Sequence, residues 1–116
     1  MARGKNEGAV ETQFVQVTST IDSEDTATLL VRKVVGARLA ACGQVSGPVS
    51  SVYWWENSVQ AEDEFLMVFK TTSLAASGLV EFLRRNHTYE NPEIVVTPII
   101  GGSEDYLEWI SSETSR

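Results

Sequence analysis

The stretch Val52-Tyr53-Trp54-Trp55-Glu56 places two of the chain's three tryptophans side by side in a segment of strand-forming residues. Neighbouring strand residues point to opposite faces, so Trp54 and Trp55 cannot both enter the core of one small domain. A large aromatic side chain buries roughly 150–250 Å², and its exposure is typical of an interface. We therefore expect Tyr53, Trp54 and Trp55 to form a subunit interface or to line a ligand cleft. The alternative is a single solvated tryptophan at the end of a hairpin.

The composition predicts one globular domain. The chain has 116 residues, 42% of them hydrophobic, which suffices for a core. Sixteen acidic against nine basic residues give a net charge of −7. Nucleic acid and membrane partners are disfavoured because both need concentrated positive charge. The single cysteine, Cys42, excludes an intrachain disulfide and favours the cytoplasm. We expect a flexible tail over residues 1–12 and a single domain over residues 13–113.

Hydrophobic patterns around the aromatic stretch predict alternating strands and helices. The first helix has Asp22 or Ser23 as its expected N-cap, and Ser73 is the expected cap of the second. A bend is expected at Gly47-Pro48, and Asn57-Ser58 is the expected hairpin turn. The apolar run 65–69 is typical of a strand that is covered on both faces. The expected strands are 13–19, 49–56, 59–71 and 93–100.

The order β-α-β-β-α-β plus a C-terminal helix predicts an α+β fold, the ferredoxin-like split βαβ sandwich. Right-handed crossovers place both main helices on one face of the sheet. A homo-oligomer would cover the other face and pair the exposed strand edges. In the C-terminal helix, which Ser103 caps, we expect Tyr106, Leu107 and Ile110 to be buried.

Five segments carry a family resemblance: Arg-Leu-Ala-Ala-Cys (38–42), Ser-Val-Tyr-Trp-Trp-Glu (51–56), Phe-Lys-Thr (69–71), His-Thr-Tyr-Glu-Asn-Pro-Glu (87–93) and Tyr-Leu-Glu-Trp (106–109). In this order and spacing, over about residues 14–112, they resemble the CutA family of divalent-cation tolerance proteins. The resemblance implies a heat-resistant homotrimer of ferredoxin-like subunits, similar to the PII signalling proteins, with strands paired between subunits. It also implies a cytoplasmic bacterial protein that is linked to tolerance of copper and other divalent cations, without an established catalytic reaction. Thr88 stands where the family usually has proline, which makes the loop less rigid.

A metal site is the first functional hypothesis. His87 is the only histidine, so a site with several imidazoles requires several subunits. Cys42 is a further candidate ligand for Cu or Zn, and Glu90 or Glu93 could add an oxygen ligand. No cofactor is required. The alternatives are a buried core cysteine and a hydrogen-bonded loop histidine. A Cys42–His87 nucleophile pair is disfavoured because no oxyanion hole is recognisable, so we do not expect an enzyme.

A ligand cleft between subunits is the second hypothesis, in which a PII-like sensor binds a small organic anion and signals to a protein partner. A third is a scaffold without a ligand. Lys70 follows an apolar run and needs an anionic partner, such as Glu64, Glu90 or a ligand carboxylate, unless it reaches water. The acidic run 62–64 provides either hard-cation ligands or a solvated strand edge. The residues expected in the cleft are Trp55, Lys70, His87, Tyr89 and Glu64.

Overall fold

The computed structural model describes residues 12–115 and has the predicted order of elements. The tail expected over residues 1–12 lies outside the described residues, except for Thr12. The elements are β1 (Phe14–Ile21), α1 (Glu24–Gly36), β2 (Cys42–Trp55), β3 (Ser58–Thr72), α2 (Ser73–Asn86), β4 (Ile94–Ile99) and α3 (Glu104–Thr114).

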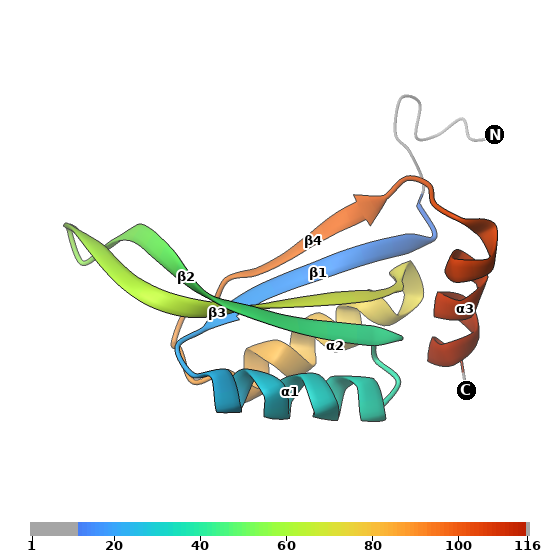
Figure 1. Ribbon diagram of the computed structural model, residues 1–116, viewed down its shortest axis with the longest axis horizontal. Helices are drawn as coiled ribbons and strands as arrows, with labels where there is room; N and C mark the ends of the chain where they lie inside the picture. Colours follow the sequence, from blue (N-terminus) through green and yellow to red (C-terminus); the bar gives the residue numbers. More distant parts are fainter. Residues whose placement is uncertain (1–11, 116) are drawn as a thin grey trace.

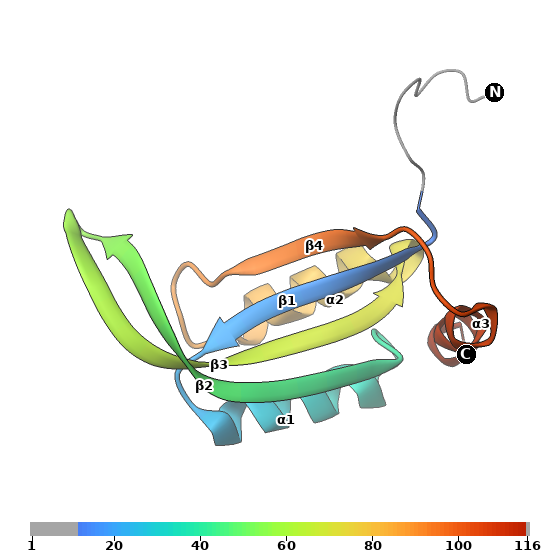
Figure 2. The ribbon, with the colours of Figure 1, turned by 45° about the horizontal axis from the view of Figure 1, so that its top comes forward.

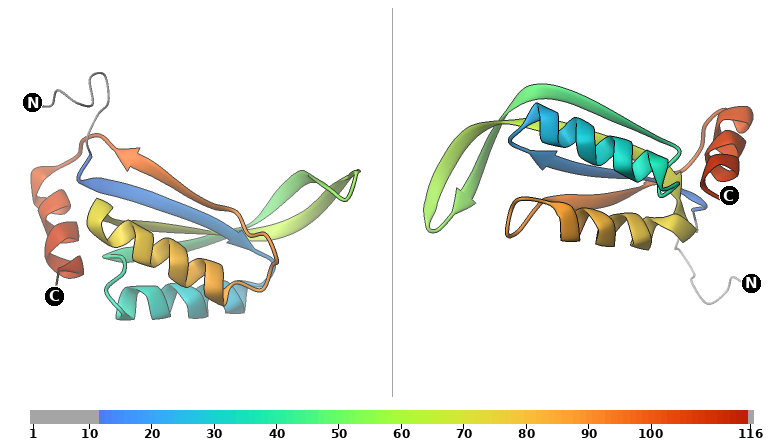
Figure 3. Two further views of the ribbon diagram at one scale, coloured as in Figure 1. Left: turned by 180° about the vertical axis from the view of Figure 1, so that it is seen from behind. Right: turned by 90° about the horizontal axis from the view of Figure 1, so that it is seen from below.

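The four strands form one antiparallel sheet in the order β2-β3-β1-β4. Helices α1 and α2 cover the same face of this sheet, as predicted (Figures 1 and 3). Within residues 12–115, the other face has only α3 against one end, where the Tyr106 hydroxyl lies 3.5 Å from the Cys42 sulfur. Strands β2 and β4 are the edges. Pro98 lies in β4, where a missing backbone donor is tolerated because the strand has a partner on only one side.

The core lies between the sheet and helices α1 and α2. Alternate residues of β3 point into it, so Met67, Phe69 and Thr71 are buried, whereas Leu66 and Val68 on the other face are only half-buried. We expected both faces of this strand to be covered. Within one chain, only the face toward the helices is fully covered. The helices contribute Ala27, Leu30, Val34, Leu79 and Leu83.

The helix caps follow the sequence with one correction. Ser23 caps α1 and accepts a hydrogen bond from the backbone N–H of Thr26. The cap of α2 is Thr72 rather than Ser73, because the Thr72 hydroxyl accepts from the backbone N–H of Ala75 at 3.2 Å. Ser103 caps α3 as predicted.

The hairpin formed by β2 and β3 projects far beyond the rest of the sheet (Figure 2). Its register shifts between Ser46 and Val49, so the bend predicted at Gly47-Pro48 is a β-bulge. The turn is Glu56-Asn57, with φ angles of 51° and 67°, because Trp55 pairs with Ser58. The prediction of Asn57-Ser58 was therefore wrong by one residue.

Helix α3 lies at the end of the molecule opposite the hairpin tip (Figure 1). Arg38, with a φ of 62°, turns the chain after α1 and donates from Nη1 to the backbone oxygen and a carboxylate oxygen of Glu113, both at 2.9 Å. Ile110 is fully buried, as predicted. Tyr106 and Leu107 were also expected to be buried, but Tyr106 is 42% exposed and Leu107 is only half-buried. No helix within residues 12–115 combines the length and apolar character needed to cross a membrane.

Candidate functional site

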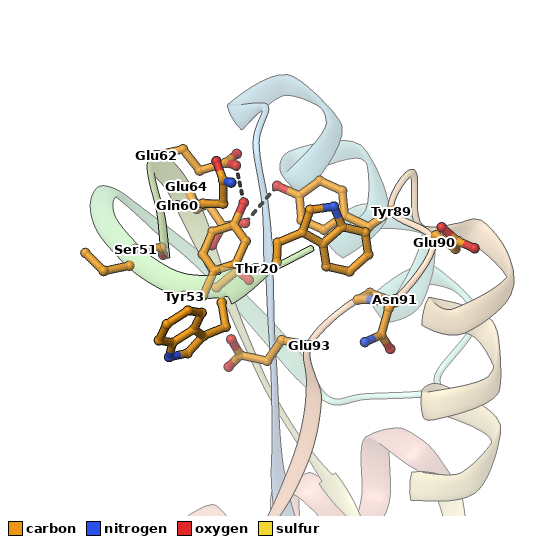
Figure 4. A pocket seen from close by; sticks show the side chains of 14 residues that line it. Thr20, Ser51, Tyr53, Gln60, Glu62, Glu64, Tyr89, Glu90, Asn91 and Glu93 are labelled. Atoms are coloured by element: carbon orange, nitrogen blue, oxygen red, sulfur yellow. Dashed lines mark hydrogen bonds between the residues drawn. The ribbon is translucent and has the colours of Figure 1, made fainter. Parts of the chain in front are cut away.

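A cleft of about 690 Å³ lies between the projecting hairpin and the connection from α2 to β4; we call it the hairpin cleft (Figure 4). Its volume falls in the range of small-molecule sites. Its lining comprises residues 51–55 of β2, Gln60, Glu62 and Glu64 of β3, Thr20 of β1 and residues 89–93 of the connection. Four of these side chains are glutamates, and none is lysine, arginine or histidine.

The hairpin register decides which aromatic residues share a face. Tyr53 pairs with Gln60, and Trp55 with Ser58, whereas Trp54 pairs with Val59 on the opposite face. The exposed fractions are 36% for Tyr53, 73% for Trp54 and 42% for Trp55. Neither tryptophan enters the core, so within the chain both keep apolar surface in water.

His87 holds the connection against the end of β1. Its Nδ1 accepts a hydrogen bond from the backbone N–H of Tyr89 at 2.9 Å, so Nε2 carries the proton and donates to the backbone oxygen of Thr20 at 2.7 Å. The rings of His87 and Tyr89 lie 4.6 Å apart between centroids. Both ring nitrogens are therefore used in ordering the loop, which is the hydrogen-bonded loop arrangement that the sequence left open.

Tyr89 reaches from the connection to Glu64 on the hairpin. Its hydroxyl donates to Oε2 of Glu64 at 2.7 Å, as Figure 4 shows. Burial raises the pKa of Tyr89 above its ordinary value, and the hydrogen bond to Glu64 raises this pKa further. The phenol therefore stays protonated and remains a donor. Glu64 is 6% exposed, so its carboxylate is almost removed from water.

Tyr53 and Glu62 form a second phenol–carboxylate pair nearer the hairpin tip. The Tyr53 hydroxyl donates to Oε2 of Glu62 (Figure 4). This hydrogen bond raises the pKa of Tyr53 to about 12. Glu62 and Glu64 lie two residues apart on one strand and therefore share a face. That spacing was visible in the sequence and could have identified Glu62 as part of the cleft.

The structure brings together three of the five residues expected in the cleft, namely Trp55, Glu64 and Tyr89, and it adds Glu90. His87 lies behind Tyr89 rather than in the lining. Lys70 is on the same face of β3 as Glu64 but six residues away, about 20 Å along the strand. The Lys70 ammonium lies 3.5 Å from Oε1 of Gln44.

The candidate metal ligands do not converge within one chain. Cys42 pairs with Lys70 and lies 3.5 Å from the Tyr106 hydroxyl, whereas His87 contacts Thr20, which pairs with Leu66. The two levels are four residues of β3 apart, or about 13 Å, too far for a shared metal with ligands at about 2 Å. No group of three or more His, Cys, Asp or Glu side chains in the described part of the chain could hold a metal ion.

The family described as CutA1 divalent ion tolerance protein matches residues 15–113. The chain belongs to the CutA1 family. The resemblance seen in the five sequence segments is thereby confirmed.

Members of the CutA1 family in bacteria and plants are similar to this chain. The divalent-cation tolerance protein CutA of Escherichia coli O139:H28 is 36% identical over 107 residues, which cover 92% of this chain and 96% of the relative. The chloroplastic CutA 1 protein of rice is 36% identical over 95 residues, or 82% of this chain. The chain spans about half the length of this relative, 54%.

A solved structure of the CutA1 family confirms the mixed α+β architecture. The divalent cation tolerance protein Cut A1 of Thermus thermophilus superimposes with a TM-score of 0.85 at 35% identity, covering 88% of this chain and 99% of that one. The four-stranded antiparallel sheet with three helices is thus the fold of known CutA1 proteins.

Proposed function

We propose that this CutA1 protein acts in divalent-cation tolerance in the cytoplasm as a homotrimer of ferredoxin-like subunits, by binding metal ions such as copper rather than by catalysis. Membership of the family carries this proposal, since the match extends over residues 15–113. The printed names of the bacterial relatives refer to tolerance of divalent cations.

The surface supports the oligomeric part of the proposal. The sheet face opposite α1 and α2 carries Val95 at 45% exposure, because Val95 pairs with Thr18 and not with the buried Val17. Trp54 projects from the hairpin at 73% exposure. Exposed large apolar side chains of this kind are typical of an interaction site. Pairing of the edge strands β2 and β4 between subunits would also satisfy their free backbone groups.

The metal ligands that we propose are Cys42, His87 and Glu90, drawn from different subunits. Cys42 is partly exposed, so its thiol is accessible to a metal. His87 would exchange the bond from the Tyr89 amide for a bond to the metal through Nδ1. Sharing ligands between subunits supplies the second and third donors that one chain lacks.

The organic-anion alternative has less support. An anion in the hairpin cleft would face Glu62, Glu64, Glu90 and Glu93 without a basic side chain in the lining. Like charges repel, and burial strengthens the repulsion. Lys70, the one cation proposed for this purpose, does not line the cleft.

Titration calorimetry with Cu(II) and Zn(II) tests the metal proposal on the metal-free oligomer. We expect Cys42→Ser and His87→Ala each to weaken binding by about tenfold or more, and Glu90→Gln to weaken it less. Binding should also weaken as pH falls, because thiol and imidazole must be deprotonated to coordinate. Glu108→Gln, an exposed charge change on α3, is the matched control. Unchanged affinity in both Cys42→Ser and His87→Ala would refute this ligand set.

A further inference from the structure

The hairpin cleft combines negative charge with aromatic surface. Glutamates come from both walls, Glu62 and Glu64 from the hairpin and Glu90 and Glu93 from the connection. Tyr53, Trp55 and Tyr89 contribute the aromatic rings, whereas the side chain of Trp54 lies on the opposite face of the hairpin. Figure 4 shows the carboxylates distributed around the cleft rather than gathered at one point.

Glu64 is the strongest determinant of what the cleft can hold. Its carboxylate is almost completely buried, yet within residues 12–115 it makes no ion pair, and its one hydrogen-bond donor is the neutral Tyr89 hydroxyl. A buried carboxylate is costly unless a cation or several donors compensate it. The structure therefore places a nearly buried carboxyl group at the cleft wall, and this group has no ion-pair partner among residues 12–115.

The arrangement favours an organic cation over a metal ion. A metal needs several oxygen, nitrogen or sulfur ligands at close range, and the described carboxylates do not form such a group. An ammonium group attached to carbon is recognised by carboxylates together with the faces of tryptophan and tyrosine rings. A cleft of about 690 Å³ is also much larger than a single ion requires.

We propose that the hairpin cleft binds a small organic ammonium ligand, with its cationic group against Glu64 and its carbon skeleton against Trp55 and Tyr89. The two acidic walls suit a ligand with a cationic group at each end, such as an alkyl diamine. This activity goes beyond metal tolerance: the residues that carry it, Glu64, Trp55 and Tyr89, are not proposed metal ligands, and Glu90 alone belongs to both sets.

Calorimetry on the full chain in its native assembly, at low ionic strength and with EDTA, tests the proposal. The probes are putrescine, a short alkyl diamine, and succinate, a dianion of similar length. We expect putrescine to bind and succinate to give no heat. The Glu64→Gln variant keeps an acceptor for Tyr89 but loses the charge, and should weaken putrescine binding by about tenfold.

Two further variants keep the test decisive. Glu93→Gln changes an exposed side chain of the cleft, so it should fold normally and still weaken putrescine binding. Glu108→Gln removes the same charge from α3 and should leave the affinity within about twofold. Equal weakening by Glu93→Gln and Glu108→Gln would mean nonspecific attraction and would overturn the proposal.

The remaining outcomes are equally informative. Absence of putrescine binding at millimolar concentration overturns the proposal. Binding only by a dissociated variant such as Trp54→Asp also overturns it, because a second copy of the chain would then fill the cleft. If Cys42→Ser loses metal binding but binds putrescine as the wild type does, the metal site and the hairpin cleft are separate sites. Each proposal can therefore fail without the other.

Discussion

The helix-covered half of the sheet and the projecting hairpin are built from the same two strands but satisfy their side chains differently. In the first half, alternate residues such as Met67 and Phe69 are fully buried against α1 and α2. Beyond the bulge at Gly47-Pro48, Trp54 and Val59 pair across the hairpin and stay 73% and 57% exposed. One half of β2 and β3 completes its packing within the chain, and the other does not.

This difference predicts that the core determines folding stability and that the hairpin determines association between subunits. Apolar burial supplies most of the favourable free energy of folding, and the chain obtains it around the core cluster of β1, β3, α1 and α2. The hairpin adds little to that core but offers a large aromatic surface. We therefore expect substitutions in the core to act on folding, and substitutions in the hairpin to act on assembly.

The largest expected effect is in the core. Phe69→Ala removes a fully buried ring and should lower the free energy of unfolding by about 3–5 kcal/mol. Urea denaturation followed by circular dichroism measures this loss. Leu29→Ala is the control, because Leu29 is 51% exposed on α1 and surface changes typically cost within about 0.5 kcal/mol. If Phe69→Ala lowered the free energy of unfolding by no more than Leu29→Ala does, the assignment of folding stability to the core would be wrong.

A substitution in the hairpin should change the mass of the assembly and leave the folded core intact. Trp54→Asp places a carboxylate where we expect a neighbouring subunit, and burying it unpaired costs several kcal/mol. Light scattering should show a mass of about three chains for the wild type and a smaller mass for the variant. Leu29→Asp, an equally drastic change on the helix layer, should keep the wild-type mass. If Trp54→Asp does the same, the hairpin is not the contact surface.

The smallest effect concerns the phenol at the hairpin tip. Because the hydrogen bond to Glu62 raises the pKa of Tyr53 to about 12, the folded state keeps this proton above pH 10, where the unfolded state loses it. The stabilisation is thus fully present below pH 10 and is lost as pH rises through the folded pKa. An ultraviolet titration of tyrosinate follows this ionisation.

The Glu62→Gln variant tests whether Glu62 causes the raised pKa of Tyr53. The pKa of Tyr53 should fall toward its ordinary value of 10.0, so one tyrosine ionises earlier than in the wild type. Glu108→Gln should leave the curve unchanged. Superimposable curves for the wild type and Glu62→Gln would show that this hydrogen bond does not form in solution.

Much of the fold was predictable because its signals are local. Leu30 and Val34 recur at helical spacing, Ser23 is a strong cap, and Gly47-Pro48 interrupts a strand in a recognisable way. The hairpin turn was placed one residue too late, because the pairing of Trp55 with Ser58 is a property of two strands rather than of the turn sequence.

The candidate site was less predictable because its contacts join distant segments. Tyr89 and Glu64 were both expected in a cleft, but their hydrogen bond links residues that are 25 apart in sequence. Lys70 was expected beside an acidic group, and only the register shows how far along β3 it lies from Glu64. No sequence signal predicts that both His87 ring nitrogens bond to the backbone. One of the two partners, Thr20, lies 67 residues away in the chain.

The β-bulge between Ser46 and Val49 has an evolutionary consequence. Because the hairpin beyond it is held mainly by its own cross-strand pairs, mutations there can accumulate without disturbing the core. Two related copies of this gene in one cell could diverge in the hairpin until their products no longer mix, while each keeps its fold. If subunits associate through the hairpin, as we propose, the bulge would allow new subunit pairings to evolve while the domain keeps its fold.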